Sequence, residues 1–259
     1  MRKKINILLP IITAICIFLI WEMVVRIREI PMYILPSPSQ ILMALKKELI
    51  ESALLSHMRI TMIEALLGIN IAIVLAVFLG VLMDAFPSFK RCIYPILVVT
   101  QTVPVIVLAP LFIIYLGFGL APKILTVVSM CFFPIVISFA DGMANVNEQY
   151  INLVKSFGAG KLRQYWLVKF PASLPTFLSG LKVAATYSIS GAVVGEWISA
   201  KNGLGYYMIR VKNAYMLDKL FACVVIIILL SLLMNGFVRL LQYITMPYAR
   251  KRKSVAIGK

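Results

Sequence analysis

The chain has 259 residues, of which 61% are hydrophobic and 14% charged, with a mean hydropathy of +0.95. This composition excludes an ordinary soluble domain and is typical of a protein built from membrane-spanning helices. The formal charge of +16 would favour nucleic-acid binding in a soluble protein. In a membrane protein we interpret it as basic cytoplasmic loops next to anionic lipid, with no nucleic-acid partner.

Six apolar segments are long enough to cross a bilayer, because a hydrocarbon core of about 30 Å requires about 20 residues of α-helix. Each should be helical, since a segment in lipid must satisfy its own backbone hydrogen bonds. The sequence therefore predicts an all-α polytopic membrane protein with a single transmembrane domain over residues 1–259. The predicted spans are 5–25, 60–83, 92–116, 123–140, 174–198 and 218–246.

The first span follows Met-Arg-Lys-Lys and resembles the start of a signal peptide. Its apolar run of about 20 residues exceeds a signal core, and no small-residue cleavage site follows, so we expect it to be retained. The distribution of Lys and Arg over the connections favours cytoplasmic N- and C-termini in the cell membrane. Loop 141–173 is then cytoplasmic, and the basic tail 250–253 is interpreted as a lipid anchor in preference to a nucleic-acid contact.

The segment after the first span begins Leu-Pro-Ser-Pro-Ser, where Ser37 or Ser39 can cap a helix. Apolar residues recur at helical spacing to about Leu55, which predicts an amphipathic helix along the outer membrane surface. His57 stands just before the second span. We interpret it as a packing or hydrogen-bonding residue in preference to a ligand or pH sensor.

The third span contains Gln101, Thr102, Pro104 and Pro110 within an otherwise apolar stretch. A proline removes a backbone donor and frees a carbonyl one turn earlier, so this helix should be bent. Two interpretations stay open: the polar residues line a translocation path, or the helix is kinked for packing and Gln101 bonds to another span.

Loop 141–173 is basic, yet its apolar residues keep a helical period on both sides of Gly158 and Gly160. The pattern predicts two short amphipathic helices, with Gly158 in the left-handed conformation ending the first and Pro171 stopping the second. Such an elbow is suited to docking a cytoplasmic partner. The candidate docking residues are Asn152, Phe157, Gly158, Ala159, Lys161, Tyr165, Trp166 and Pro171.

The fifth span carries a stripe of small residues that should let another helix approach closely, namely Ala184, Ser188, Gly191 and Gly195. Thr186 and Ser190 lie on an adjacent face and join Gln101, Thr102 and Pro104 as candidate residues of the translocation path. Glu196 ends the span at its outer side, where it serves either an external gate or a hydrogen bond to the outer loop.

No nucleotide-binding Gly-x-x-x-x-Gly-Lys-Ser/Thr run occurs in the sequence, nor do the common motifs of metalloproteases or serine hydrolases. We therefore expect neither an enzyme nor a bound cofactor or metal. Glu22, Glu64 and Lys182 are scattered along the chain, and we expect them to lack partners.

Several stretches resemble ATP-binding-cassette (ABC) importer permeases. In their cytoplasmic loop signature a glycine is followed by Ile, Leu and Pro, and Gly158, Val168, Phe170 and Pro171 match these positions. The signature opens with Glu-Ala-Ala, but this chain has Asn152, Leu153 and Val154. The stretches 35–39 and 101–119 resemble in particular the permeases for taurine, alkanesulfonates, nitrate and the pyrimidine precursor of thiamine. The stretch 202–206 resembles the family's short Gly-Leu-Gly segment, and 191–197 looks most like the permeases for the pyrimidine precursor.

The resemblance implies a MetI-like permease fold, two ATPase subunits, an extracytoplasmic binding protein and a second permease copy, most simply as a homodimer. It implies import of a small polar solute, either the pyrimidine precursor of thiamine or a sulfonate, taurine or nitrate. The alternative is a secondary transporter driven by an ion gradient. That class is typically built from inverted repeats, and we find no internal repeat.

Overall fold

The computed structural model describes residues 2–50, 53–199 and 201–246, and this part of the chain contains helices and no strands. The basic tail 250–253 lies outside these residues. In chain order the elements are α1 (Arg2–Ile27), α2 (Pro38–Ile50), α3 (Ala53–Ala85), α4 (Pro87–Thr100), α5 (Val105–Leu116), α6 (Leu120–Ala144), α7 (Glu148–Ser156), α8 (Lys161–Gln164), the π-helix η1 (Tyr165–Lys169), α9 (Phe170–Ser199), α10 (Leu204–Asn213) and α11 (Leu217–Thr245).

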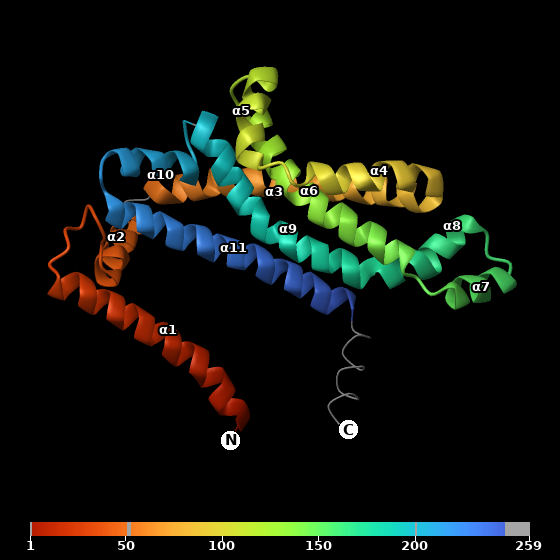
Figure 1. Ribbon diagram of the computed structural model, residues 1–259, viewed down its shortest axis with the longest axis horizontal. Helices are drawn as coiled ribbons and strands as arrows, with labels where there is room; N and C mark the ends of the chain where they lie inside the picture. Colours follow the sequence, from red (N-terminus) through yellow and green to blue (C-terminus); the bar gives the residue numbers. More distant parts are fainter. Residues whose placement is uncertain (1, 51–52, 200, 247–259) are drawn as a thin grey trace.

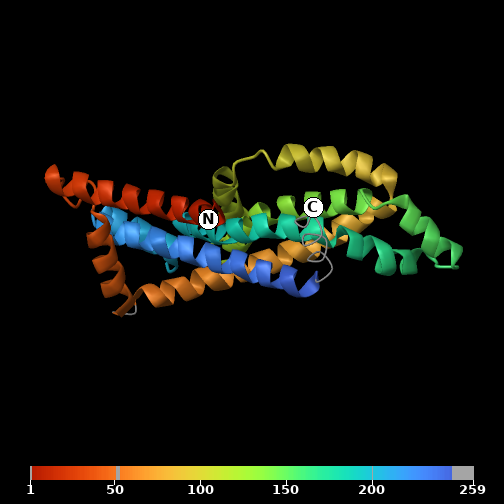
Figure 2. The ribbon, with the colours of Figure 1, turned by 90° about the horizontal axis from the view of Figure 1, so that it is seen from below.

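Five helices are long and apolar enough to cross a membrane, and the bent pair α4 and α5 can supply a sixth span. The long helices follow the long axis of the molecule (Figure 1). Helices α7 and α8 lie at one end of this axis, and α2 and α10 lie at the other. Figure 2 shows α2 running crosswise to the long helices.

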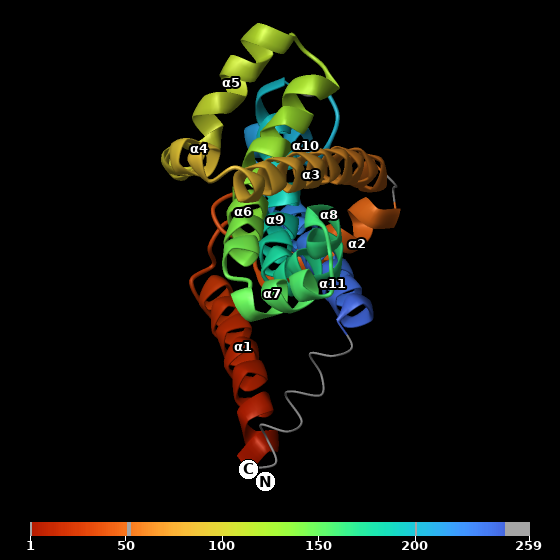
Figure 3. The same cartoon turned by 90° about the vertical axis from the view of Figure 1, so that its right-hand side faces the viewer.

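The predicted third span is two helices meeting at 102°, not one bent helix. Helix α4 ends at Thr100, and Pro104 is the N-cap of α5 with extended backbone angles. The break falls here because a proline disfavours helical angles in the residue before it and supplies no donor. Viewed along the long axis, α5 and α1 project from opposite sides of the central helices (Figure 3).

The centre of the fold is the packing of α6 against α9, with α3 and α11 alongside. The predicted stripe of small residues on α9 lies in this interface and lets the backbones of α6 and α9 approach closely. A Cβ atom added to Gly191 would lie 3.1 Å from the Cα of Val127, and one added to Gly195 would lie 3.0 Å from the Cα of Lys123. Ala184 and Ser188 are fully buried in the same interface.

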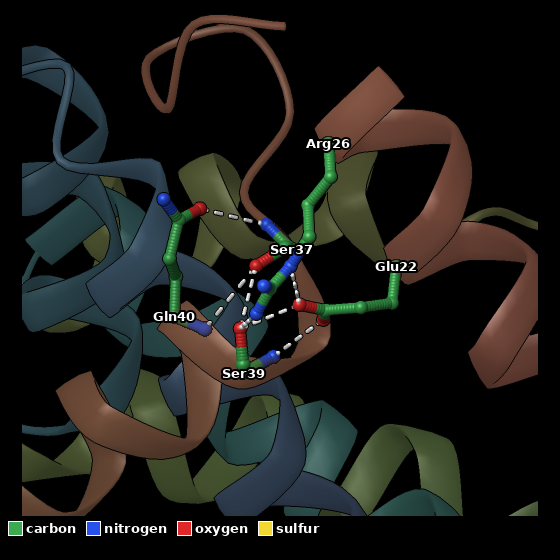
Figure 4. A network of polar contacts seen from close by, with 5 residues as sticks. All are labelled: Glu22, Arg26, Ser37, Ser39 and Gln40. Atoms are coloured by element: carbon green, nitrogen blue, oxygen red, sulfur yellow. Dashed lines mark hydrogen bonds and ion pairs between the residues drawn. The ribbon is translucent and has the colours of Figure 1, made fainter. Parts of the chain in front are cut away.

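A polar network joins the end of α1 to the start of α2 (Figure 4). The Glu22 carboxylate accepts hydrogen bonds from Arg26 at 2.6 Å and from the backbone N–H of Ser39 at 3.0 Å, so the expectation that Glu22 lacks a partner was wrong. Ser37 caps α2 as predicted, and it forms a capping box in which the Gln40 amide oxygen accepts from the Ser37 N–H at 2.9 Å.

Helix α2 packs its apolar face on the protein: Ile41 and Ala44 are buried in a cluster with Ala222 of α11. Beside them Lys219 forms an ion pair with Glu48 at 2.6 Å. Burial raises the pKa of the Glu48 carboxyl, but the Lys219 hydrogen bond and charge outweigh it, so the pKa lies below its ordinary value.

The prediction that Pro171 stops a helix was wrong. The chain is helical from Lys161 through the π-turn η1 into α9, and Pro171 is the second residue of α9. In the π-turn the Phe170 N–H bonds to the Tyr165 carbonyl, five residues back. This wider turn accommodates a proline at the point where a regular α-helix would lose a hydrogen bond and crowd the ring.

Candidate functional site

The elbow, defined here as residues 148–171, is a helix, a tight turn and a second helix. Asn147 caps α7 by accepting a hydrogen bond from the Gln149 N–H at 2.9 Å. At the other end Gly158 has φ +79°, as the sequence predicts. The N–H groups of Gly158 and Ala159 bond to the carbonyls of Lys155 and Val154, which is the double hydrogen bond of a Schellman turn.

The second half of the turn has ordinary backbone angles. Gly160 has φ −65° and is the N-cap of α8. The Gln164 side chain donates a hydrogen bond to the Ala159 carbonyl at 2.8 Å and holds the turn closed. The geometry of the elbow is therefore set by local hydrogen bonds, and only Gly158 requires a glycine for its backbone conformation.

The elbow exposes large apolar side chains at the end of the molecule. Phe157 is 83% exposed and Trp166 67% exposed, with Leu162 and Tyr150 also exposed. Of the other predicted docking residues, Asn152 and Lys161 are exposed and Tyr165 is half-buried. A shallow groove of about 330 Å³ between α7 and the start of α9 is lined by Tyr150, Leu153, Val154, Leu167, Val168, Pro171 and Ala172.

Sequence reasoning missed the anchor of this elbow. Asp84, in the last turn of α3, accepts hydrogen bonds from the Tyr165 hydroxyl and the Lys169 ammonium, both at 2.5 Å. Lys169 also lies 4.9 Å from the centre of the Tyr165 ring. One feature of the sequence could have pointed to Asp84. It is an acidic residue directly after the predicted span 60–83, at a helix C-terminus, where the helix dipole disfavours negative charge and a basic partner is therefore expected.

The candidate path residues do not form one site. Gln101 lines a cavity of about 580 Å³ between the α4–α5 break and helices α6 and α9, and Tyr187 of α9 lines the same cavity. Thr102 and Pro104 are exposed in the break. Thr186 instead accepts a hydrogen bond from Asn235 of α11 at 3.1 Å, and Ser190 is half-buried.

Glu196 is buried at the opposite end from the elbow and bonds to the outer loop. Its carboxylate accepts from the Thr61 hydroxyl and the Gly205 N–H, each at 2.6 Å. His57 accepts from the Gly203 N–H at 2.9 Å, as expected for a hydrogen-bonding residue. Of the two interpretations of Glu196, the geometry supports the hydrogen bond to the loop.

Glu64 is also partnered, so the expectation that it lacks a partner was wrong. Lys123 of α6 forms an ion pair with it at 2.7 Å, and Glu64 is fully buried. The two residues are 59 positions apart. They come together because α3 packs against α6. Both residues lie toward the end of the molecule where Glu196 and His57 bind the loop from Gly203 to Gly205.

The model of one protein family, the inner membrane component of binding-protein-dependent transport systems, matches residues 68–243. The chain belongs to this family. This permease is 35% identical to a formylaminopyrimidine transport permease protein of Halalkalibacterium halodurans. The alignment covers 97% of this chain and all of that protein. It is 34% identical over 88% of its length to 93% of a probable ABC transporter permease of Haemophilus influenzae.

More distant relatives include a putative aliphatic sulfonates permease of Bacillus subtilis, 27% identical over 93% of this chain and 87% of that protein. The fold is similar to that of the MetNI methionine ABC transporter in an inward-facing conformation. The TM-score is 0.61 at 18% identity, over 74% of this permease and 97% of that chain. The expected MetI-like fold is thereby confirmed.

The permease is therefore the transmembrane subunit of an ATP-driven, binding-protein-dependent importer. Its family implies an ATPase subunit and a binding protein as partners and a location in the inner membrane. The alternative of a secondary transporter driven by an ion gradient is wrong. The relatives are transport permeases, which agrees with the expectation that this chain is not an enzyme.

Proposed function

We propose that the elbow is the surface on which the ATPase subunit docks. The observation that supports this most is the rigid turn at Gly158, which presents Phe157, Leu162 and Trp166 to solvent at the end of the long axis (Figure 1). Exposed aromatic side chains on a pre-formed turn are costly unless another protein covers them. Lys155, Lys161 and Arg163 surround them with positive charge.

The proposed cargo is a neutral or weakly basic pyrimidine of the formylaminopyrimidine class. The relative that transports formylaminopyrimidine is similar over nearly the whole chain. The cavity beside the α4–α5 break supports the same choice. It offers the aromatic rings of Phe133 and Tyr187 and the amide of Gln101, and its described lining contains no Lys or Arg to balance a sulfonate or nitrate.

Two copies of the permease are proposed to face each other across helix α5. This helix stands away from the central helices (Figure 3) and exposes Ile106, Val107, Ile114 and Tyr115. An apolar projection of this kind is suited to packing against a second copy, and it would enclose the cavity at Gln101 between the two subunits. Two copies also present two elbows to two ATPase subunits.

Reconstitution tests the function directly. The permease purified alone should hydrolyse no ATP, because its sequence has no phosphate-binding loop. Together with its ATPase and binding-protein partners in liposomes it should import labelled formylaminopyrimidine. Excess unlabelled formylaminopyrimidine should compete, whereas taurine and an alkanesulfonate should not. Competition by taurine alone would replace the proposed cargo with a sulfonate.

The orientation is proposed to place both termini and the elbow in the cytoplasm. Ser156 ends α7 and Asn202 lies just before α10, and both residues are exposed. Helices α7 and α10 lie at opposite ends of the long axis (Figure 1). Cysteine replaces each in turn in a background without Cys16, Cys92, Cys131 and Cys223. A membrane-impermeant maleimide should label Ser156→Cys only from the cytoplasmic side and Asn202→Cys only from outside. Reversed labelling would separate the elbow from any cytoplasmic ATPase.

A further inference from the structure

Asp84 ties the elbow to α3, a helix that is not next to the elbow in the sequence, as α6 and α9 are. Its carboxylate holds both the Tyr165 hydroxyl and the Lys169 ammonium, from the first and last residues of the π-turn. The Asp84 side chain is 9% exposed and that of Lys169 20% exposed. Because water has little access, this ion pair is stronger and more specific in geometry than a pair on an open surface.

The position of Asp84 is unfavourable without these partners. It lies one residue before the end of α3, where the carbonyl ends of the helix dipole repel a carboxylate. A π-turn is also an uncommon structure that occurs frequently at functional sites. The Asp84 carboxylate at the helix end and the π-turn are therefore both locally unfavourable, and the contact between them stabilises each.

A short turn joins Asp84 to helix α4. Pro87 begins α4 three residues later. Phe86 between the two helices donates its N–H to the Leu82 carbonyl of α3 and accepts the Lys90 N–H of α4, each at 3.0 Å. Figures 1 and 2 show this turn at the same end of the molecule as α7 and α8. Helix α4 ends at Thr100, and Thr100 and Gln101 line the cavity together with Tyr187.

We propose that Asp84 is a positioning residue that transmits movement of the elbow to α3 and α4, and through α4 to the cavity at Gln101. This inference rests on the proposed docking of the ATPase at the elbow. When the ATPase pair closes, the elbow moves, and the Lys169–Asp84–Tyr165 contact makes the α3–α4 turn follow. Without the contact, the elbow is connected to the spans through α9 and α6 only, and ATP is hydrolysed without moving the α4 side of the cavity wall.

The test is the number of ATP molecules hydrolysed per formylaminopyrimidine imported by the complete importer in liposomes. Asp84→Asn keeps an acceptor for Tyr165 and removes the charge that holds Lys169. We expect normal co-purification of the ATPase and an ATP cost per import raised about tenfold, within the usual range of coupling between two sites. The charge-swapped protein with Asp84→Lys and Lys169→Asp should recover most of the coupling, because the pair is restored.

Asp141→Asn is the matched control. Asp141 is a carboxylate near the end of α6 that accepts a hydrogen bond from Tyr94 at 3.2 Å, and asparagine retains an acceptor there. Its ATP cost should stay within about twofold of the unmodified protein. If Asp84→Asn does not accumulate in the membrane, Lys169→Gln removes the same ion pair from the other side and should raise the ATP cost.

An unchanged ATP cost in both Asp84→Asn and Lys169→Gln overturns the inference. So does a loss of ATPase co-purification in these variants, because Asp84 would then support docking instead of transmission. A failure of the docking proposal has a different readout. It would appear as normal ATPase co-purification when the Gly158 turn itself is disrupted, whatever the ATP cost of the Asp84 variants.

Discussion

Gly158→Val should abolish substrate uptake while leaving the permease in the membrane at normal abundance. Gly158 has φ +79°, and a β-branched residue at that angle costs at least about 1–2 kcal/mol. An added Cβ would meet no atom within 4 Å, so the penalty is purely one of backbone conformation. The chain relieves it by leaving the left-handed region, which breaks the hydrogen bonds from Gly158 and Ala159 to the end of α7.

The expected consequence is loss of ATPase co-purification together with uptake, because Phe157 and Trp166 no longer face the partner in one arrangement. Gly160→Ala is the matched control. Gly160 has φ −65° and also has no neighbour within 4 Å of an added Cβ, so alanine there should leave both measurements unchanged. Asn152→Ala should also be mild, since Asn152 is exposed and this chain lacks the family's glutamate there. Normal uptake by Gly158→Val at normal abundance would show that the elbow does not couple the ATPase to transport.

Glu196→Ala should lower the stability of the permease more than any elbow variant. Glu196 is 1% exposed, and its removal leaves the Gly205 N–H and the Thr61 hydroxyl without this acceptor inside the protein. The unpaired Gly205 N–H and the Thr61 hydroxyl, which keeps only its 3.2 Å bond to the His57 carbonyl, together cost about 2–4 kcal/mol. For a chain of this size the midpoint of thermal unfolding in detergent should fall by about 5–15 °C.

Glu196→Gln should be intermediate, because its amide oxygen can accept one of the two hydrogen bonds while its NH₂ group faces the other donor. The loop from Gly203 to Gly205 should also become more accessible in Glu196→Ala, so that Asn202→Cys reacts faster from outside. If Glu196→Ala unfolds at the same temperature as the unmodified protein, Glu196 does not hold the outer loop, and a role in the external gate regains support.

The amino-acid sequence by itself determined those features that depend on a residue and its near neighbours along the chain. The apolar segments predicted the long helices, because hydrophobic length and helical period are local properties. The cap at Ser37 and the positive φ of Gly158 were predicted correctly, since capping and left-handed turns depend on a few adjacent residues. The small-residue stripe on α9 identified a close helix contact but not the helix that fills it.

The tertiary structure alone decided which polar groups meet. Asp84 and Lys169 are 85 residues apart, and Thr61 and Glu196 are 135 apart, so no local pattern pairs them. The expectation that Glu22 and Glu64 lack partners was wrong for this reason. Pro171 lies inside a helix because a π-turn precedes it, and the tertiary contact of that turn with Asp84 lies outside any local pattern. There the backbone adopts a locally unfavourable geometry that a contact with a distant helix stabilises.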